Sequence, residues 1–402
     1  MTLSEKTQPT DNGLNYKTNY LLPITNRPEL CFIRGKGDYL YDQTGKQYLD
    51  LIQGWAVNTL GHSPKIMQQT LFEQSQMLIN PGPAFYNKPM LNLAENLCQH
   101  SVFDQVFFAN SGAEANEGAI KLARKWGQLN KDGANKIITF DQGFHGRTLA
   151  TMSATGKERF NRLYEPKVPG FTKVPFNDLE AAKAAIDKHT VAIMLEPVQG
   201  EAGVIPAMPE FMSNLRELCD QHNLLLIMDE VQTGIGRTGK LFCYEHYGVC
   251  PDIMTLGKGL GGGFPISALL THKKFSCFEP GDQGGTFNGN PLACSVANAV
   301  FTEVSSTAFL ESSQSNASYL KKKLEGLVRK FNLLGVRGKG MLLALNTANL
   351  YAPEIVQRAL KEGLLLNAPR PDTLRFMPAL NIQKEAINEG IGILERILEE
   401  TI

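Results

Sequence analysis

Short apolar runs, each followed at once by polar or glycine residues, recur through the middle of the chain. Five of them can be recognised, at residues 106–109, 137–140, 191–195, 224–228 and 253–256. Their apolarity is continuous and does not alternate, which is typical of strands buried on both faces of a parallel sheet. Residues 113–126 and 209–222 have the composition or the apolar spacing of helices. We therefore expect an α/β fold whose large domain, at residues 61–295, has a mostly parallel sheet flanked by helices.

The C-terminal part of the chain has longer helical stretches and fewer apolar runs. Helices are predicted at 312–331, at 353–362 and at the end of the chain near Glu400, with apolar runs at 341–345 and 364–366. This pattern predicts a smaller α+β domain at residues 296–402. We expect residues 1–60 to pack with that domain.

The residues that follow the apolar runs mark where a site is expected. In a parallel sheet covered by helices, ligands bind beyond the carboxyl ends of the strands. Polar or glycine residues occupy these ends at 110–112, 141–143, 196–197, 229–230 and 257–258. We therefore expect these five segments to converge.

Charge and cysteine content narrow the classes of partner and compartment. Forty basic residues balance forty acidic ones, so no overall field attracts nucleic acid or an anionic membrane. No apolar run approaches the roughly 20 residues that a membrane helix needs, and the polar start at 1–13 does not resemble a signal peptide. The seven cysteines are scattered without a CxxC pair. We therefore expect no disulfide framework and a cytoplasmic protein.

One cluster of possible metal ligands lies outside the apolar runs. Cys243, Glu245, His246 and Cys250 could be drawn as a metal site. They lack the paired-ligand spacing of known zinc sites. We therefore interpret this stretch as structural and expect no metal.

Two stretches match the dinucleotide pattern GxGxxG, at 234–239 and 257–262. The first begins five residues beyond its strand, and the second leads into Phe264 and Pro265 instead of a helix. The fingerprint needs a glycine turn directly between a strand and a helix. Gly259 follows Lys258 where a Walker A loop needs Ser or Thr. These mismatches disfavour a nicotinamide enzyme and a P-loop nucleotidase.

Three positions at the ends of the runs suggest chemistry. The turn at 111–113 opens a helix, whose free amides suit a phosphate, although Glu114 makes an ordinary capping box equally compatible. Lys258 lies between glycines, where partial desolvation would lower the pKa of its amine toward nucleophilic use. Asp229 ends the most apolar run, where a carboxylate is costly unless it caps a turn or pairs with a cation such as a protonated pyridine nitrogen.

Five motifs, taken in order and spacing, resemble the class III aminotransferases. They are NSGAEAN at 110–116, FHGRT at 144–148, EPVQGEAG at 196–203, DEVQTG at 229–234 and LGKG at 256–259. The resemblance extends from about Tyr41 to Leu380 and is greatest to the acetylornithine branch of the family, with ornithine aminotransferases as near relatives. It implies a fold-type I homodimer with shared active sites and pyridoxal 5′-phosphate as cofactor.

The resemblance also implies a role for each residue around the cofactor. Lys258 would carry the cofactor as an imine and then move the proton at the reacting carbon, and Asp229 would pair with the pyridine nitrogen. The remaining contacts would be Gln232 at the 3′-oxygen, Val231 under the ring, Phe144 stacked above it, the amides of Gly112 and Ala113 at the phosphate with Ser111 in support, and Thr286 at the phosphate from the other subunit.

Substrate recognition is expected to depend on carboxylate binding by arginine. Arg147 matches the family arginine that binds the carboxylate remote from the reacting carbon, and Arg375 matches the one that binds the α-carboxylate of glutamate. Glu201 matches the glutamate that pairs with Arg375 and masks it when a δ-amino donor is bound. The alternatives are surface ion pairs for the arginines and a solvated loop carboxylate for Glu201.

The sequence departs from the family at the expected substrate site. Gly285 replaces a common serine and Asn288 a common glycine, so any substrate contact at Gly285 must come from its backbone. Trp55 is bulkier than the expected aliphatic residue. It would narrow the mouth of the site if it lay there, but its apolar neighbours lead us to favour a position in the core.

The resemblance implies transfer of the amino group of N2-acetylornithine to 2-oxoglutarate, giving N-acetylglutamate 5-semialdehyde and glutamate in arginine biosynthesis. The expected partners are therefore the small-molecule amino donor, 2-oxoglutarate and a second copy of the chain, with no nucleic acid and no membrane. Alternatives with the same chemistry are ornithine, succinylornithine and 4-aminobutyrate aminotransferases. An aminomutase is disfavoured by the loop at 199–201 and by the two arginines, and a non-catalytic binding module by the presence of Lys258 and Asp229.

Overall fold

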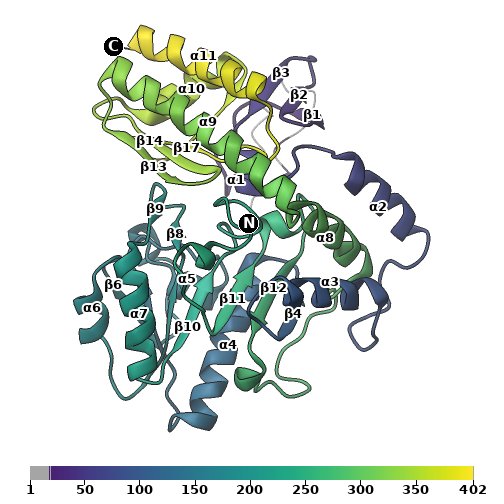
Figure 1. Ribbon diagram of the computed structural model, residues 1–402, viewed down its shortest axis with the longest axis vertical. Coiled ribbons are helices and arrows are strands. Elements are labelled where there is room, and N and C mark those ends of the chain that lie inside the picture. The colour runs from purple at the N-terminus through teal and green to yellow at the C-terminus, as the bar shows by residue number, and fades with distance from the viewer. Residues whose placement is uncertain (1–17, 19, 402) are drawn as a thin grey trace, which may run out of the picture.

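The computed structural model describes residues 18 and 20–401 of the chain. The predicted absence of a signal peptide concerns residues 1–13 and lies outside the described residues. Figure 1 shows two layered domains, one with β4, β10, β11 and β12 and the other with β13, β14, β17 and α9 to α11.

The large domain is built on a seven-stranded sheet. Its strands, in spatial order, are β4 (Gln105–Ala109), β12 (Ser267–Thr271), β11 (Ile253–Leu256), β10 (Leu225–Asp229), β7 (Thr190–Leu195), β5 (Lys136–Phe140) and β6 (Phe171–Val174). Only β12 runs antiparallel to its neighbours in this sheet. The predicted mostly parallel sheet is therefore confirmed, and each of the five predicted strands lies within one residue of its expected bounds. Strands β6 and β12 were not predicted.

Alternate residues of the central strands enter two different cores. On β10, Leu226 and Met228 pack in one core with residues of α7 (Pro209–Gln221), whereas Leu225 and Ile227 pack in the other with residues of α4 (Gly112–Asn130). The sheet is thus covered on both faces, which explains why its strands are apolar at every position. The shorter helices of this region are α5 (Leu149–Ala154) and α6 (Leu179–Ala184).

The small domain contains a four-stranded antiparallel sheet covered by helices (Figure 1). The sheet has the order β13 (Gly335–Lys339), β14 (Leu342–Asn346), β17 (Thr373–Phe376) and β16 (Asn367–Arg370), with helices α9 (Thr307–Phe331), α10 (Ala352–Lys361) and α11 (Lys384–Thr401). Hydrophobic residues of α9 and α11 belong to the largest core, together with residues of β14 and β17. The predicted α+β content of this part is confirmed.

Residues from both ends of the chain share a second small sheet. It has the order β1 (Phe32–Lys36), β2 (Tyr39–Asp42), β3 (Gln47–Asp50) and β15 (Leu364–Leu365), and β15 runs parallel to β3. The division of the chain at residues 60 and 295 stays a prediction.

The other elements are α1 (Gln53–Ala56), α2 (Lys65–Ser75), α3 (Lys88–Gln99), α8 (Pro291–Val304), the two-residue strands β8 (Val198–Gln199) and β9 (Ile205–Pro206), and the 3₁₀ turns η1 (Glu158–Phe160), η2 (Cys243–His246), η3 (Lys258–Leu260) and η4 (Lys273–Phe275).

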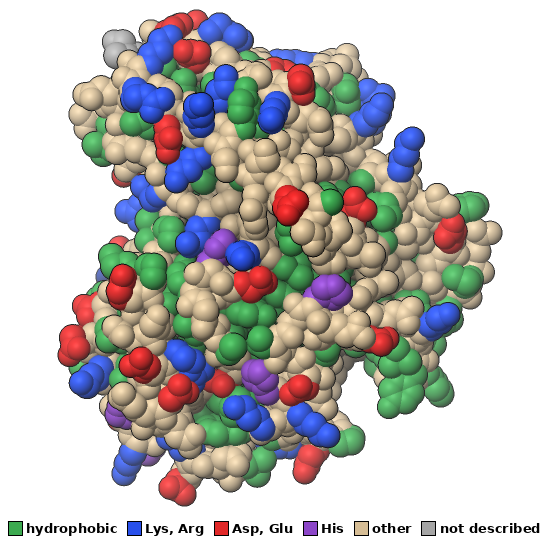
Figure 2. All heavy atoms as spheres, in the orientation of Figure 1, with side chains coloured by type: hydrophobic (Ala, Val, Ile, Leu, Met, Phe, Trp, Pro, Cys, Tyr) green, Lys and Arg blue, Asp and Glu red, His purple; other side chains and the backbone are tan. Residues whose placement is uncertain are grey.

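The surface reflects the balanced composition of the chain. On the face shown in Figure 2, acidic and basic side chains are interspersed over both domains. Within residues 18 and 20–401, helices fall short of the combination of length and apolarity that crossing a membrane requires.

A buried carboxylate connects the end of β10 to η2. Glu230 is 1% exposed, and its side chain accepts backbone N–H bonds from Cys243 at 2.6 Å and Tyr244 at 2.8 Å. Burial raises the pKa of Glu230 to about 8, although these two backbone donors lower it in part. The group therefore binds its proton more tightly in the folded protein than in the unfolded chain.

Glu230→Gln is expected to flatten the dependence of stability on pH. Because the folded pKa of about 8 lies above the unfolded value of 4.5, the stabilising contribution of Glu230 is complete below 4.5 and is lost as the pH rises toward 8. The thermal midpoint of the wild-type holoenzyme should fall more between about pH 5.5 and 8 than that of the variant. Glu217→Gln, which removes an exposed carboxylate from α7, is the control. Parallel curves for Glu230→Gln and wild type would contradict this prediction.

Candidate active site

The carboxylate of Asp229 is buried at the carboxyl end of β10 and is held by three polar groups. Its Oδ2 accepts a bond from Asn116 Nδ2 at 2.7 Å and lies 2.9 Å from His145 Nδ1, and its Oδ1 accepts the Val231 N–H at 3.1 Å. Asn116 is itself fixed, because its Oδ1 accepts the hydroxyl of Thr255 on β11 at 2.7 Å. The orientation of Asp229 is thus set by α4, the loop after β5 and strand β11.

Lys258 lies at the carboxyl end of the neighbouring strand, β11, in the turn η3. Its φ of 40° is in the left-handed region, which is uncommon for a side chain with a Cβ and is typical of functional positions. Burial lowers the pKa of its amine, while the carboxylates of Asp229, Glu196 and Glu201 raise it in part. Lys258 is therefore an amine with reduced hydration in a site that also contains carboxylates.

The turn at the start of α4 forms the predicted capping box. Ser111 Oγ accepts the Glu114 N–H at 3.3 Å, and Glu114 Oε2 accepts the Ser111 N–H at 2.9 Å. The N–H groups of Gly112 and Ala113 are in the first turn and have no acceptor within the helix. The cap and an anion site are therefore compatible, because the cap uses different amides.

Two glycines allow this turn to approach Lys258 closely. A Cβ on Gly112 would lie 2.6 Å from Val231 Cγ1, and a Cβ on Gly257 would lie 3.2 Å from the same atom and 3.4 Å from Gly112 Cα. Val231 therefore packs between the start of α4 and the residue that precedes Lys258. Any larger residue at Gly112 would displace this contact.

The residues predicted for the two faces of the cofactor ring and its 3′-oxygen lie around the same place. Phe144 is partly buried, and its N–H donates to Glu196 Oε1 at 2.8 Å. Gln232 is 6% exposed, and its Oε1 is buried without a hydrogen-bond partner among the described residues. A Cβ on Gly200 would lie 1.7 Å from this oxygen, so only glycine fits beside it.

These residues fit pyridoxal phosphate. They offer a buried carboxylate for a ring nitrogen, first-turn amides for a phosphate, the Gln232 NH2 group with a second donor for the 3′-oxygen and a partly dehydrated lysine amine. A buried polar atom without a partner is rare in folded proteins and indicates a missing ligand or water.

Glu201 lies between two cations. Its Oε1 accepts a bond from Arg375 Nη2 at 2.8 Å, and its Oε2 accepts one from Lys157 Nζ at 2.6 Å. Burial alone would raise the pKa of Glu201, but the charges of Arg375 and Lys157 lower it to about 2. Arg375 is not in a surface ion pair and Glu201 is not a solvated loop carboxylate, which were the alternatives. The Arg375 side chain is 1% exposed, and Glu201 is paired with it.

Arg147 lies at the surface, near the start of α5. Its guanidinium is 5.9 Å from the centre of the Phe160 ring. Within the described residues it has no carboxylate within ion-pair distance, so the predicted alternative of a surface ion pair is not formed. It is accessible to a carboxylate from solution.

The loop that contains Thr286 is at the surface. Thr286 is exposed, and Asn288 Oδ1 accepts a bond from Asn110, the residue before the α4 turn, at 3.1 Å. A Cβ on Gly285 would lie 2.7 Å from Asn288 Oδ1. The two departures from the family at these positions therefore fit each other, because glycine leaves the space that the larger Asn288 occupies.

The prediction that Trp55 lies in the core is wrong. Trp55 is 51% exposed, and its carbonyl oxygen accepts a bond from Gln232 Nε2 at 3.4 Å. Gln53, Gly54, Trp55 and Ala56 all have positive φ, and this unusual turn directs the Trp55 side chain away from the core that its apolar neighbours enter. Trp55 thus lies beside the site, as the other interpretation required.

Sequence reasoning missed the groups that orient the predicted residues. Asn116 and His145 lie in the quoted motifs but received no role, although both contact Asp229. Glu196 is 6% exposed, and burial together with the charge of Asp229 raises its pKa to about 7. A polar residue at the end of an apolar run was the available signal for Glu196. Lys157 lies outside every motif, so no signal pointed to it.

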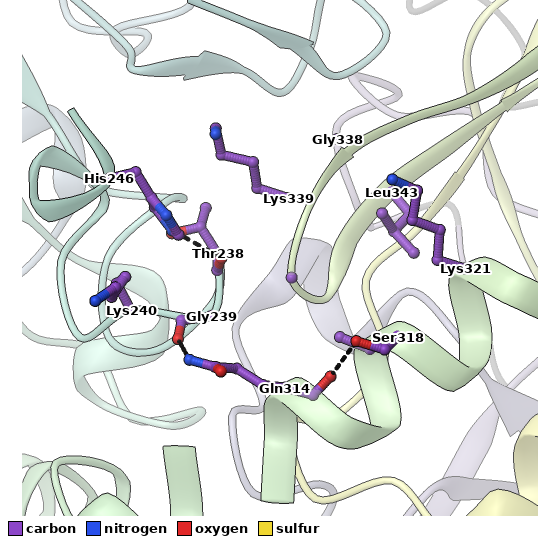
Figure 3. Close-up of a pocket in the computed structure, with 12 residues that line it drawn as sticks. Thr238, Gly239, Lys240, His246, Gln314, Ser318, Lys321, Gly338, Lys339 and Leu343 are labelled. Carbon is purple, nitrogen blue, oxygen red and sulfur yellow. Dashed lines mark hydrogen bonds between the residues drawn. The ribbon is translucent and has the colours of Figure 1, made fainter. Parts of the chain in front are cut away.

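A second cavity lies between the two domains, apart from these residues. It has a volume of ≈ 380 Å³ and is lined by the turn at Thr238 and Gly239, by residues of α9 and by the β13–β14 hairpin (Figure 3). None of the predicted cofactor or substrate residues lines it. His246, from the cluster once considered as a metal site, borders it and contacts the Thr238 carbonyl oxygen at 2.9 Å. Over the described ranges, no three His, Cys, Asp or Glu side chains are grouped to hold a metal ion.

Comparison with known proteins gives the same family throughout. Residues 24–398 match the family Aminotransferase class-III. Acetylornithine aminotransferase 2 of Bordetella pertussis is 57% identical over 386 residues, which cover 95% of this chain and 98% of that protein. The N-acetylornithine aminotransferase structure from Stenotrophomonas maltophilia is 36% identical with a TM-score of 0.82, covering 95% of this chain and 98% of that one. The ornithine aminotransferase structure from Toxoplasma gondii is 30% identical with a TM-score of 0.89, covering 97% of each chain. The chain therefore belongs to the class-III aminotransferases.

Proposed function

We propose that this protein transfers the δ-amino group of N2-acetylornithine to 2-oxoglutarate, with pyridoxal 5′-phosphate as cofactor, and so forms N-acetylglutamate 5-semialdehyde and glutamate in arginine biosynthesis. The observation that carries this proposal is the Arg375–Glu201 pair, a buried arginine whose guanidinium is occupied by an exchangeable carboxylate. The similarity to acetylornithine aminotransferases supports the choice of donor.

Each cofactor group has a candidate partner in the chain. Asp229 would pair with the protonated ring nitrogen, and Val231 and Phe144 would contact the two faces of the ring. Gln232 would bind the 3′-oxygen, and the first-turn amides at Gly112 would bind the phosphate. When bound, pyridoxal phosphate supplies an electron sink that makes the C–H bond beside the reacting amine acidic.

Lys258 would hold the cofactor and act on the proton of the reacting carbon. Its amine has a lowered pKa because of burial, so a neutral form able to accept a proton is more populated than at an exposed lysine. The nearby carboxylates of Asp229 and Glu196 then stabilise the protonated form. Lys258 can therefore take up a proton and return it within the same site.

The two arginines would bind the carboxylates of both substrates. Arg147 is accessible and unpaired, and it would bind the carboxylate remote from the reacting carbon. Arg375 would bind the α-carboxylate of glutamate or 2-oxoglutarate after Glu201 leaves it. With acetylornithine, whose reacting carbon carries no carboxylate, Glu201 would stay on Arg375. One site thus accommodates a δ-amino donor and an α-oxo acid.

We further propose that the protein acts as a cytoplasmic homodimer with shared active sites. Large apolar side chains are exposed around α2 and α3 and in the Thr286 loop, including Tyr86 at 85% and Phe287 at 60%. Figure 2 shows hydrophobic side chains gathered at the right of the molecule, near these helices. Exposed apolar clusters of this kind are typical of protein interfaces.

A donor panel with 2-oxoglutarate as acceptor tests the proposed substrate. We expect kcat/KM for N2-acetylornithine to exceed that for free ornithine by roughly tenfold or more, with N2-succinylornithine and 4-aminobutyrate also below it. Faster turnover of free ornithine would reject the proposed donor. Product formation without any oxo acid would instead indicate an aminomutase. Lys258→Ala is the control and should lack transamination with every donor.

Glu201→Ala is expected to slow the half-reaction with acetylornithine more than the half-reaction with glutamate, by roughly tenfold. The variant leaves Arg375 buried and open, so the donor carboxylate can bind there in an unproductive orientation. Single-turnover absorbance changes of the holoenzyme measure each half-reaction separately. Equal losses in both half-reactions would remove the masking role.

Thr286→Ala is expected to weaken cofactor retention by roughly tenfold through loss of a hydrogen bond to the phosphate. Mixed dimers decide which subunit is affected. A dimer with Thr286→Ala on one chain and Lys258→Ala on the other retains one intact shared site, so its active site should hold the cofactor normally. In a dimer with both changes on one chain, the only site that keeps Lys258 lacks Thr286. That site should therefore lose the cofactor. The reverse pattern would show that Thr286 acts within its own subunit.

A further inference from the structure

Lys157 is the second cation on Glu201, and no established role accounts for it. Its Nζ donates to Glu201 Oε2 at 2.6 Å, while Arg375 occupies the other carboxylate oxygen at 2.8 Å. The Lys157 side chain is 14% exposed. The pair is therefore largely shielded from water, which makes it stronger than an ordinary surface ion pair.

The remaining contacts of Arg375 show which of its partners is exchangeable. Arg375 Nε donates to Asn367 Oδ1 at 3.0 Å, and Nη1 donates to the Gly200 carbonyl oxygen at 2.8 Å. Both acceptors are neutral, and they hold the plane of the guanidinium. Glu201 is the only carboxylate on it within the described residues, so an incoming substrate carboxylate would replace Glu201.

A displaced Glu201 needs another cation. Its side chain is 25% exposed, and an ionised carboxylate without a partner at such a position is costly. The charge of Lys157 helps to keep the pKa of Glu201 near 2, so the group stays ionised at neutral pH. Lys157 already contacts the oxygen that Arg375 does not use, so Glu201 can leave Arg375 without losing its second ion pair.

Lys157 also contacts a side chain other than Glu201. Its Nζ lies 5.4 Å from the centre of the Phe144 ring, a distance typical of a cation–π contact. Phe144 is fixed in turn by Glu196, whose Oε1 accepts the Phe144 N–H at 2.8 Å and whose Oε2 accepts the Gly200 N–H at 3.4 Å. Lys157 therefore has a contact with Phe144 in addition to its ion pair with Glu201.

We propose that Lys157 is a positioning residue that holds Glu201 while Arg375 binds the α-carboxylate of the oxo acid. This inference rests on the proposed function, because it assumes that Arg375 is the carboxylate site. Lys157 stabilises the state in which Glu201 has left Arg375, and so lowers the free energy needed for the oxo acid to bind there. The donor half-reaction, in which Glu201 stays on Arg375, does not need this state.

Lys157→Gln tests the proposal through binding and half-reactions of the holoenzyme. Glutarate, a dicarboxylate without an oxo group, is the binding probe, and we expect its dissociation constant and the KM for 2-oxoglutarate to rise about tenfold. The rate constant for acetylornithine in its half-reaction should change by less than about threefold. Lys157→Arg should restore most of the binding. Arg159→Gln, which removes an exposed cation two residues away, is the matched control and should bind glutarate as the wild type does.

The Glu201→Ala background separates positioning from direct substrate binding. If Lys157 acts through Glu201, adding Lys157→Gln to Glu201→Ala should leave the dissociation constant of glutarate unchanged within about twofold. A tenfold loss that persists in this background would show direct contact with substrate and overturn the proposal. Unchanged glutarate binding in Lys157→Gln alone, or an equal loss in the donor half-reaction, would overturn it as well.

These outcomes differ from those that would reject the proposed function. The wild-type enzyme can first be treated with an amino donor, so that it carries the donated amino group. If this form does not react with 2-oxoglutarate, the proposed function is refuted without any variant. A preference for another amino donor would change the donor alone, because glutarate binding does not involve the donor.

Discussion

The buried carboxylate of Asp229 is the constraint on which the rest of the site depends. A charge at the end of an apolar strand is stable only when polar groups replace its lost hydration. Asn116 from α4, His145 from the loop after β5 and the Val231 amide supply these groups. Asn116 and His145 come from segments far apart in the sequence, and Asn116 is in turn bonded to Thr255 on β11, so satisfying one carboxylate brings α4, the loop after β5 and the strand before Lys258 to the same edge of the sheet.

Around this carboxylate, acidic and basic groups are paired so that partners can be exchanged. Lys258 lies in the field of three carboxylates, and Glu201 bridges Arg375 and Lys157. None of these charges is well hydrated, so each needs a partner in every state of the reaction. A substrate carboxylate that enters therefore takes the place of one already present. Under the proposed function, such an exchange would let a single site accept a donor with a remote carboxylate and an acceptor with a carboxylate next to the reacting carbon.

Close backbone approaches determine the shape of the same site. Gly112 and Gly257 let Val231 pack between the start of α4 and the turn of Lys258, and Gly200 leaves the space that Gln232 fills. Gly285 and Asn288 show that such contacts can be rebuilt, since the loss of a side chain at one position makes room for a larger one at the other. Trp55 is exposed, and its backbone carbonyl contacts Gln232 at the same site.

The sequence by itself determined the elements and the residues at their ends. Continuous apolar runs are sufficient to identify strands that are covered on both faces, and Asp229 and Lys258 could be located because they directly follow such runs. Strands β6 and β12 lack this signal because Thr172 and Lys173 interrupt β6, and Ser267 and Thr271 leave only three apolar residues in β12. What only the tertiary structure decided is which groups meet. His145 lies 84 residues and Asn116 113 residues from Asp229, and no periodicity connects them. Trp55 is a further case, because its position is determined by a turn with unusual backbone angles. Lys157 is another, because its partner is determined by the need of a buried charge for an opposite one. Local patterns report the hydrophobic burial of a segment, whereas ion pairs and close contacts depend on distances that exist only after the chain has folded.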